Sequence, residues 1–103
     1  DEGSKSLGEF ALIHYHSTIN ELKKLFYYTL YDENASCHMA LGIGFSECIK
    51  GGIDIDKKEL FEKGVNDSLV HVDFMMGTED LMIDGILEDG RHVKIFEKGN
   101  FVF

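Results

Sequence analysis

Hydrophobic and polar residues alternate with a period of two in five stretches of the chain, a pattern typical of half-buried β-strands. The predicted strands cover residues 10–15, 37–43, 69–75, 82–87 and 91–96. The last two flank the pair Asp89-Gly90, which tolerates the positive φ angles of a type I′ turn. We therefore expect a β-hairpin near the C-terminus.

Two further stretches have the spacing of α-helices. Apolar residues recur at every third or fourth position across residues 19–31, and Thr18 with Glu21 forms a capping box at their start. A shorter helix is predicted between Asp56, a suitable N-cap, and Gly64, a common residue just past a helix end. These elements predict an α+β fold with a mixed, largely antiparallel sheet, two helices and a C-terminal hairpin.

The composition describes one folded unit over residues 1–103, because 44% of the residues are hydrophobic and no linker or repeat interrupts them. A net charge of −9 without a basic stripe argues against a nucleic-acid partner. No apolar run approaches the roughly 20 residues that a membrane span requires. Two cysteines without a Cys-rich framework fit a reducing compartment, so we expect the cytoplasm.

The tripeptide His71-Val72-Asp73 places an imidazole and a carboxylate two residues apart in a predicted strand. Such side chains project from the same face, about 7 Å apart, and can reach one metal ion or two adjacent ones. On the opposite face, Val70, Val72 and Phe74 are expected to anchor the strand in the core. A surface histidine beside a solvated aspartate has the same spacing, so both interpretations stay open.

Two more residues are candidate metal ligands. His38 shares a strand face with Ala40 and Gly42, whose small side chains leave room for an ion. Glu9 lies at the start of an otherwise apolar strand, where an unpaired carboxylate is costly to bury and favours a cation. The alternatives are that His38 is a core histidine with satisfied hydrogen bonds and that Glu9 sits at an exposed strand end.

Two other ligand sets are weaker candidates. His14 and His16 also lie two residues apart, and Cys37 with Cys48 could supply thiolates to zinc. No Cys-x-x-Cys motif accompanies the cysteines, so a zinc site of the structural type is not indicated. The preferred set is therefore Glu9, His38, His71 and Asp73.

Three long motifs occur in order along the chain: LGEFAL at residues 7–12, DENASCHMALG at 32–42, and GVNDS at 64–68 running into HVDFMMG at 71–77. Together they closely resemble the thermophilic-metalloprotease family of aminopeptidases, of the aminopeptidase T and aminopeptidase S type. The similarity covers essentially the whole chain but only the C-terminal part of such enzymes. The resemblance therefore implies that the chain is the C-terminal portion of the catalytic metal-binding domain of a longer aminopeptidase.

The resemblance also implies a role for each candidate ligand. Glu9 matches a glutamate that bridges two metal ions and is catalytic. His38 and His71 match two histidines on one metal, and Asp73 matches a carboxylate on the other. A fifth ligand, a second glutamate, is expected upstream of Asp1.

The activity implied by the resemblance is two-metal hydrolysis that releases N-terminal residues from peptides with metal-activated water. Two divalent ions, zinc or cobalt, and a homodimer are implied with it. Phe45 departs from the family pattern, which has a tyrosine near the metals, so one hydrogen bond of that site is expected to be missing. The isolated chain is expected to retain one weakened metal site and no activity. A competing hypothesis is a non-enzymatic acidic α+β interaction or dimerisation module with structural histidines.

Overall fold

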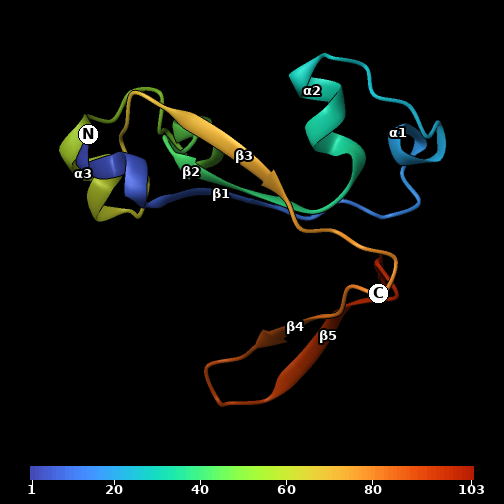
Figure 1. Ribbon diagram of the computed structural model, residues 1–103. Coiled ribbons are helices and arrows are strands. Elements are labelled where there is room, and N and C mark those ends of the chain that lie inside the picture. The colour runs from blue at the N-terminus through green and yellow to red at the C-terminus, as the bar shows by residue number, and fades with distance from the viewer. The chain divides into compact units, whose positions relative to one another are not determined.

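The computed structural model describes all 103 residues and has an α+β architecture with two three-stranded sheets (Figure 1). Two compact units are formed, one from Asp1–Ala11 with Met39–Phe74 and the other from Leu12–His38 with Met75–Phe103. The α+β class and the antiparallel pairing agree with the sequence pattern. The strands are, however, divided between two sheets.

The first sheet carries the candidate ligands. Its strands are β1 (Leu7–Ala11), β2 (His38–Gly42) and β3 (His71–Met75), with β2 in the centre. Past the end of β2, the N–H of Ile43 donates to the carbonyl oxygen of Val70 at 2.8 Å. Strands were predicted at 37–43 and 69–75, so both predictions are confirmed with slightly shorter bounds.

The first strand lies further toward the N-terminus than its predicted range, 10–15. After Ala11 the chain leaves the sheet, because its next backbone groups bond to other partners. The N–H of Ile13 donates to Cys37 Sγ, and the thiol donates to the carbonyl of Ile13, both at 3.3 Å. The N–H of Tyr15 donates to the carbonyl of Gly99 at 2.8 Å. As a result Glu9 lies in the middle of β1.

The better buried face of the first sheet is the one that carries the candidate ligands. His38 is 2% exposed and Ala40 is fully buried, whereas Val70, Val72 and Phe74 are 41 to 57% exposed. The expectation that these three residues anchor β3 in a core is therefore wrong for this chain. The α-helices are only four to six residues long, so they supply little surface to cover an apolar sheet face.

Two short helices replace the single helix predicted over 19–31. They are α1 (Thr18–Glu21), capped by Ser17, and α2 (Thr29–Asp32). Lys23 and Tyr27 have φ angles of +48° and +55°, which a right-handed helix cannot contain. The carboxylate of Asp32 accepts hydrogen bonds from the N–H groups of Phe26 and Tyr28, at 2.8 and 3.2 Å. These local bonds compete with helix formation and close the intervening loop.

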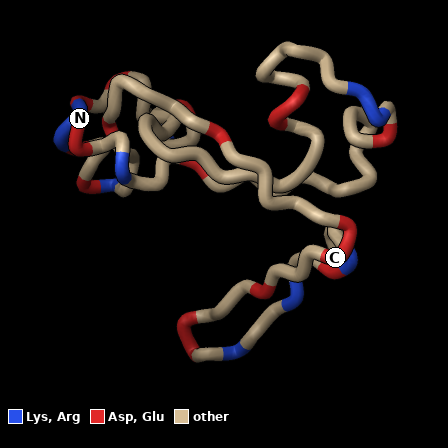
Figure 2. Tube along the Cα trace, in the orientation of Figure 1, with Lys and Arg blue, Asp and Glu red and all other residues tan.

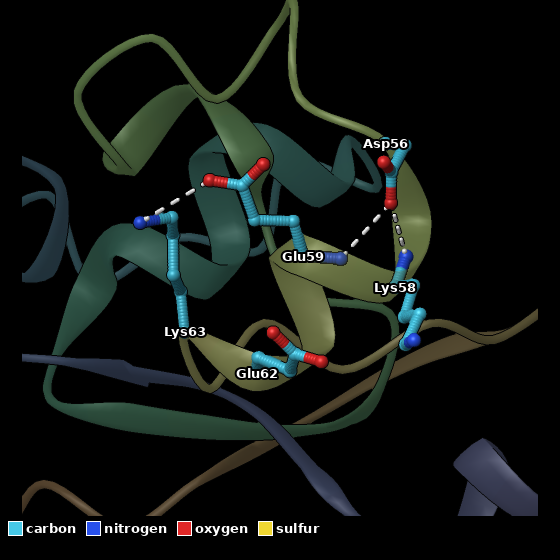
Figure 3. Close-up of a pocket in the computed structure, with 5 residues that line it drawn as sticks. All are labelled: Asp56, Lys58, Glu59, Glu62 and Lys63. Atoms are coloured by element: carbon cyan, nitrogen blue, oxygen red, sulfur yellow. Dashed lines mark hydrogen bonds and ion pairs between the residues drawn. The ribbon is translucent and has the colours of Figure 1, made fainter.

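The helix predicted after Asp56 is confirmed as α3 (Lys57–Glu62). Figure 3 shows its N-terminus, where Asp56 Oδ1 accepts hydrogen bonds from the backbone N–H groups of Lys58 and Glu59 at 2.9 and 3.0 Å. Glu59 also pairs with Lys63, with 3.5 Å between Oε1 and Nζ. The hollow in this view is bounded by the charged side chains of one short helix, and the candidate ligands are not among its lining residues.

The second sheet consists of β4 (Ile83–Ile86), β5 (His92–Glu97) and β6 (Asn100–Phe101), paired antiparallel in that order. The hairpin of β4 and β5 is confirmed, but its type I′ turn is not. Only Gly90 has a positive φ, of +83°, and its N–H donates to the carbonyl of Leu87. The loop is thus one residue longer than a type I′ hairpin and ends in a left-handed glycine. Fully buried Phe96 packs against Phe101 of β6, with the rings tilted and 4.3 Å between their centroids.

Three 3₁₀ segments complete the secondary structure: η1 (Glu2–Lys5), η2 (Glu33–Ala35) and η3 (Ser46–Cys48). Acidic positions are spread along the chain among fewer basic ones (Figure 2), in line with the net charge of −9. None of the helices has the length and apolar character needed to cross a bilayer.

Candidate metal centre

The first sheet collects the four residues that the sequence singled out. Glu9 lies on β1, His38 on β2, and both His71 and Asp73 lie on β3. One ligand atom from each of Glu9, His38 and Asp73 falls within 4.8 Å of the other two. Residues separated by more than sixty positions along the chain are thus neighbours on one sheet.

His71 faces both carboxylates of this cluster. Its Nε2 lies 3.2 Å from Oε2 of Glu9 and 3.3 Å from Oδ1 of Asp73. Its Nδ1 lies 2.8 Å from the carbonyl oxygen of Ile43. Because a carbonyl oxygen can only accept, Nδ1 must carry the hydrogen of this bond. In the neutral ring, Nε2 therefore presents a lone pair toward the two carboxylates.

His38 is oriented in the same way. Its Nδ1 lies 3.1 Å from the carbonyl oxygen of Ser36, so Nδ1 is again the donor and Nε2 carries the lone pair of the neutral ring. Histidines that bind metals characteristically donate their second ring N–H to a carbonyl or carboxylate, which determines the tautomer and raises ligand basicity. Both histidines thus have the backbone partner that a metal ligand needs.

Lone pairs and carboxylate oxygens at these distances repel one another unless a positive charge lies among them. Oδ1 of Asp73 is buried and has no hydrogen-bond partner. Burial acts to lower the pKa of His71, but the Ile43 carbonyl and the charges of Asp73 and Glu9 outweigh it, so the pKa is raised. These groups therefore hold a proton on the imidazole more tightly than water does.

The donor set and its spacing also suit a divalent cation. With bonds of about 2.1 Å, two ligands of a tetrahedral ion lie about 3.4 Å apart, close to the 3.2 and 3.3 Å that separate His71 from the carboxylates. A mixture of imidazole and carboxylate ligands is compatible with zinc and its neighbours in the first transition row. The buried, unbonded oxygen of Asp73 is the observation that most directly calls for such an ion.

Gly42 lets the backbone of β2 approach the chain at the start of β3 closely. Gly42 has a φ of +110°, and a methyl group there would overlap the carbonyl oxygen of Val70. The ring of Phe45 lies 5.2 Å from that of His71, centroid to centroid, and forms an apolar wall beside the imidazole. Phe45 has no hydroxyl, so it cannot make the hydrogen bond that a tyrosine at this position would offer.

The weaker ligand sets have other partners. Nδ1 of His14 lies 3.2 Å from the side-chain oxygen of Asn100, and Nδ1 of His16 lies 2.7 Å from a carboxylate oxygen of Glu21. Cys37 and Cys48 are both free thiols, the first buried and the second exposed. Neither pair is part of the cluster of potential ligands around Glu9.

The two backbone carbonyls that orient the histidines were not foreseen from the sequence. Ser36 and Ile43 supply these groups, at 3.1 and 2.8 Å from the imidazoles. Every residue has a carbonyl, so no pattern of side chains could have indicated which ones face the site. Only the approach of the strands reveals them.

Comparisons with known proteins agree with the geometry. The family model of thermophilic metalloproteases (M29) matches residues 1–101. Aminopeptidase 2 of Geobacillus stearothermophilus and aminopeptidase AmpS of Bacillus subtilis are each 50% identical over 103 residues, which is all of this chain and 25% of each relative. The chain thus spans about a quarter of the length of these relatives.

A solved structure shows the same fold over this region. Wild-type AmpT from Thermus thermophilus superposes with a TM-score of 0.87 at 39% identity, covering 100% of this chain and 25% of that one. Because the family match extends over nearly every residue and the fold agrees, the chain belongs to the thermophilic metalloprotease family (M29).

Proposed function

We propose that this chain carries four ligands of the metal centre of a two-metal aminopeptidase, which releases N-terminal residues from peptides. The observation that supports this most strongly is the convergence of Glu9, His38 and Asp73 within 4.8 Å around a buried carboxylate oxygen without a hydrogen bond. The aminopeptidase names of the relatives support the reaction class.

Each ligand has a separate task in this proposal. Glu9 lies beside His71 and clusters with Asp73, so its carboxylate would serve both ions of a two-metal centre. The neutral imidazoles of His38 and His71 would hold an ion through Nε2, and Asp73 through the oxygen that accepts no hydrogen bond. When bound, divalent ions polarise the peptide carbonyl and activate water.

The free N-terminal amine of a peptide would bind beside the ions that the two carboxylates hold. This would place the first peptide bond at the ions, in line with cleavage from the end of a peptide. The ring of Phe45 lies beside that of His71 and would help to keep water from one side of the imidazole. Exclusion of water strengthens the electrostatic interactions within the site.

The remaining parts of the proposal concern the whole protein. We propose that residues 1–103 form the C-terminal portion of the catalytic domain, that the ions are zinc or cobalt, and that the enzyme is a cytoplasmic homodimer. The chain by itself is expected to bind one ion weakly and to lack activity, because a further glutamate ligand is expected upstream of Asp1.

Calorimetric titration with zinc and with cobalt tests the ligand set. We expect His71→Ala and Asp73→Asn each to weaken zinc binding by about tenfold or more, since removal even of residues that support a ligand costs 10- to 100-fold. His92→Ala is the matched control, because His92 lies on β5, outside the cluster. The protein encoded by the complete reading frame should hydrolyse leucine p-nitroanilide when loaded, and should lose this activity with either variant.

Two outcomes would contradict the proposal. Unchanged zinc uptake by His71→Ala would favour an acidic interaction module with structural histidines. Two tight zinc equivalents per isolated chain would show that the expected upstream glutamate is not needed.

A further inference from the structure

A cavity of about 330 Å³ lies within the unit formed by Asp1–Ala11 and Met39–Phe74. Its walls come from β1, from the segment that follows β2, and from the residues after α3. Its larger lining residues are Glu9, Phe10, Ala11, Phe45, Ile49 and Val65.

Two of these residues also belong to the candidate metal centre or contact it. Glu9 lines the cavity, and its carboxylate lies 3.2 Å from Nε2 of His71. The ring of Phe45 lines the cavity and lies 5.2 Å from the imidazole ring of the same histidine. The cavity and the centre therefore share a wall.

The chemistry of the lining restricts what the cavity can hold. The side chains are aromatic or aliphatic apart from Glu9 and the thiol of Cys48, and no lysine or arginine is among them. Its volume is at the lower end of the roughly 300–1,000 Å³ typical of ligand sites. A space of this size has room for a large apolar side chain.

We infer, resting on the proposed function, that this cavity receives the side chain of the N-terminal residue of the substrate. The first residue of a peptide has its amine and carbonyl at the ions, so its side chain must point into a space that adjoins them. The apolar walls favour leucine, methionine or phenylalanine at this position. Alanine buries less apolar surface against these walls, and lysine buries a charge whose nearest lining carboxylate, Glu9, is engaged at the centre.

Filling the cavity tests this inference. Cys48 is exposed at its edge, so Cys48→Phe adds bulk without replacing a buried residue. In the zinc-loaded protein from the complete reading frame, we expect this variant to lower kcat/KM for leucine p-nitroanilide by about tenfold, within the range by which a pocket discriminates side-chain size. The value for alanine p-nitroanilide should change by less than about twofold.

Val93→Phe is the matched control, because Val93 is an exposed residue of β5 and does not line the cavity. This variant should leave kcat/KM for both substrates unchanged. A thermal melt of each variant verifies folding. The inference is overturned if Cys48→Phe lowers kcat/KM for both substrates by the same factor, or for neither.

A second measurement does not depend on activity. The rate at which iodoacetamide alkylates Cys48 is followed by peptide mass spectrometry in the presence of L-leucinamide or glycinamide. Slower alkylation with leucinamide alone supports the cavity as a side-chain site, and equal rates overturn it. A wild-type protein that hydrolyses neither substrate but shows this protection would contradict the proposed function and leave the cavity assignment standing.

Discussion

Replacing Gly42 with alanine should destabilise the protein more than replacing any glycine in open space. Gly42 has a φ of +110°, and an added methyl would overlap the carbonyl of Val70 and approach the Cα of His71 to 3.3 Å. The same carbonyl accepts the hydrogen bond from Ile43 that joins β2 to β3. Relief of the overlap must therefore separate these strands.

The magnitude has two parts. An L-residue in left-handed backbone costs about 1–2 kcal/mol. Loss of the Ile43–Val70 hydrogen bond adds about 1 kcal/mol. The sum is about 2–3 kcal/mol, which corresponds to roughly 10–20 °C in the melting temperature of a domain of this size.

Urea unfolding of Gly42→Ala and Gly64→Ala separates the two parts. Gly64 has a φ of +89° with nothing within 4 Å of an added methyl, so its variant measures only the backbone cost. Zinc titration of the same variants should show weaker binding for Gly42→Ala alone, because the carbonyl of Ile43 orients His71. Equal unfolding free energies for the two variants would refute the reasoning.

Two further predictions concern the unit formed by Leu12–His38 and Met75–Phe103. The hydrogen bond from His16 lowers the pKa of Glu21 below 4.5, so this pair stabilises the fold above that pH and is lost as the pH falls through the folded-state pKa. An NMR titration of the Glu21 carboxyl carbon should show the lowered pKa and its return to normal in His16→Ala; an unaltered titration in that variant would argue against the pairing. Cys37→Ala should destabilise by about 2 kcal/mol, because both backbone groups of Ile13 lose their partner, and thermal unfolding indistinguishable from wild type would contradict this role of the thiol.

Local sequence signals predicted some elements well and others poorly. Asp56 and Gly64 correctly indicated the bounds of α3, because cap residues act within one turn of the chain. The helix predicted over 19–31 failed because the Asp32 carboxylate holds two loop N–H groups, a competition that apolar spacing does not reveal. The first strand was misplaced because the Cys37 thiol, far along the chain, bonds to the backbone of Ile13.

The candidate ligands were recognisable from residue type, spacing and family motifs, so the sequence by itself determined which side chains are available for metal chemistry. Only the tertiary structure decided that Glu9, His38 and Asp73 meet, which carbonyls set the imidazole tautomers, and that an apolar cavity adjoins them. The physical reason is distance along the chain. Hydrophobic periodicity and helix capping act over a few residues, whereas the site depends on strand pairing between segments tens of residues apart.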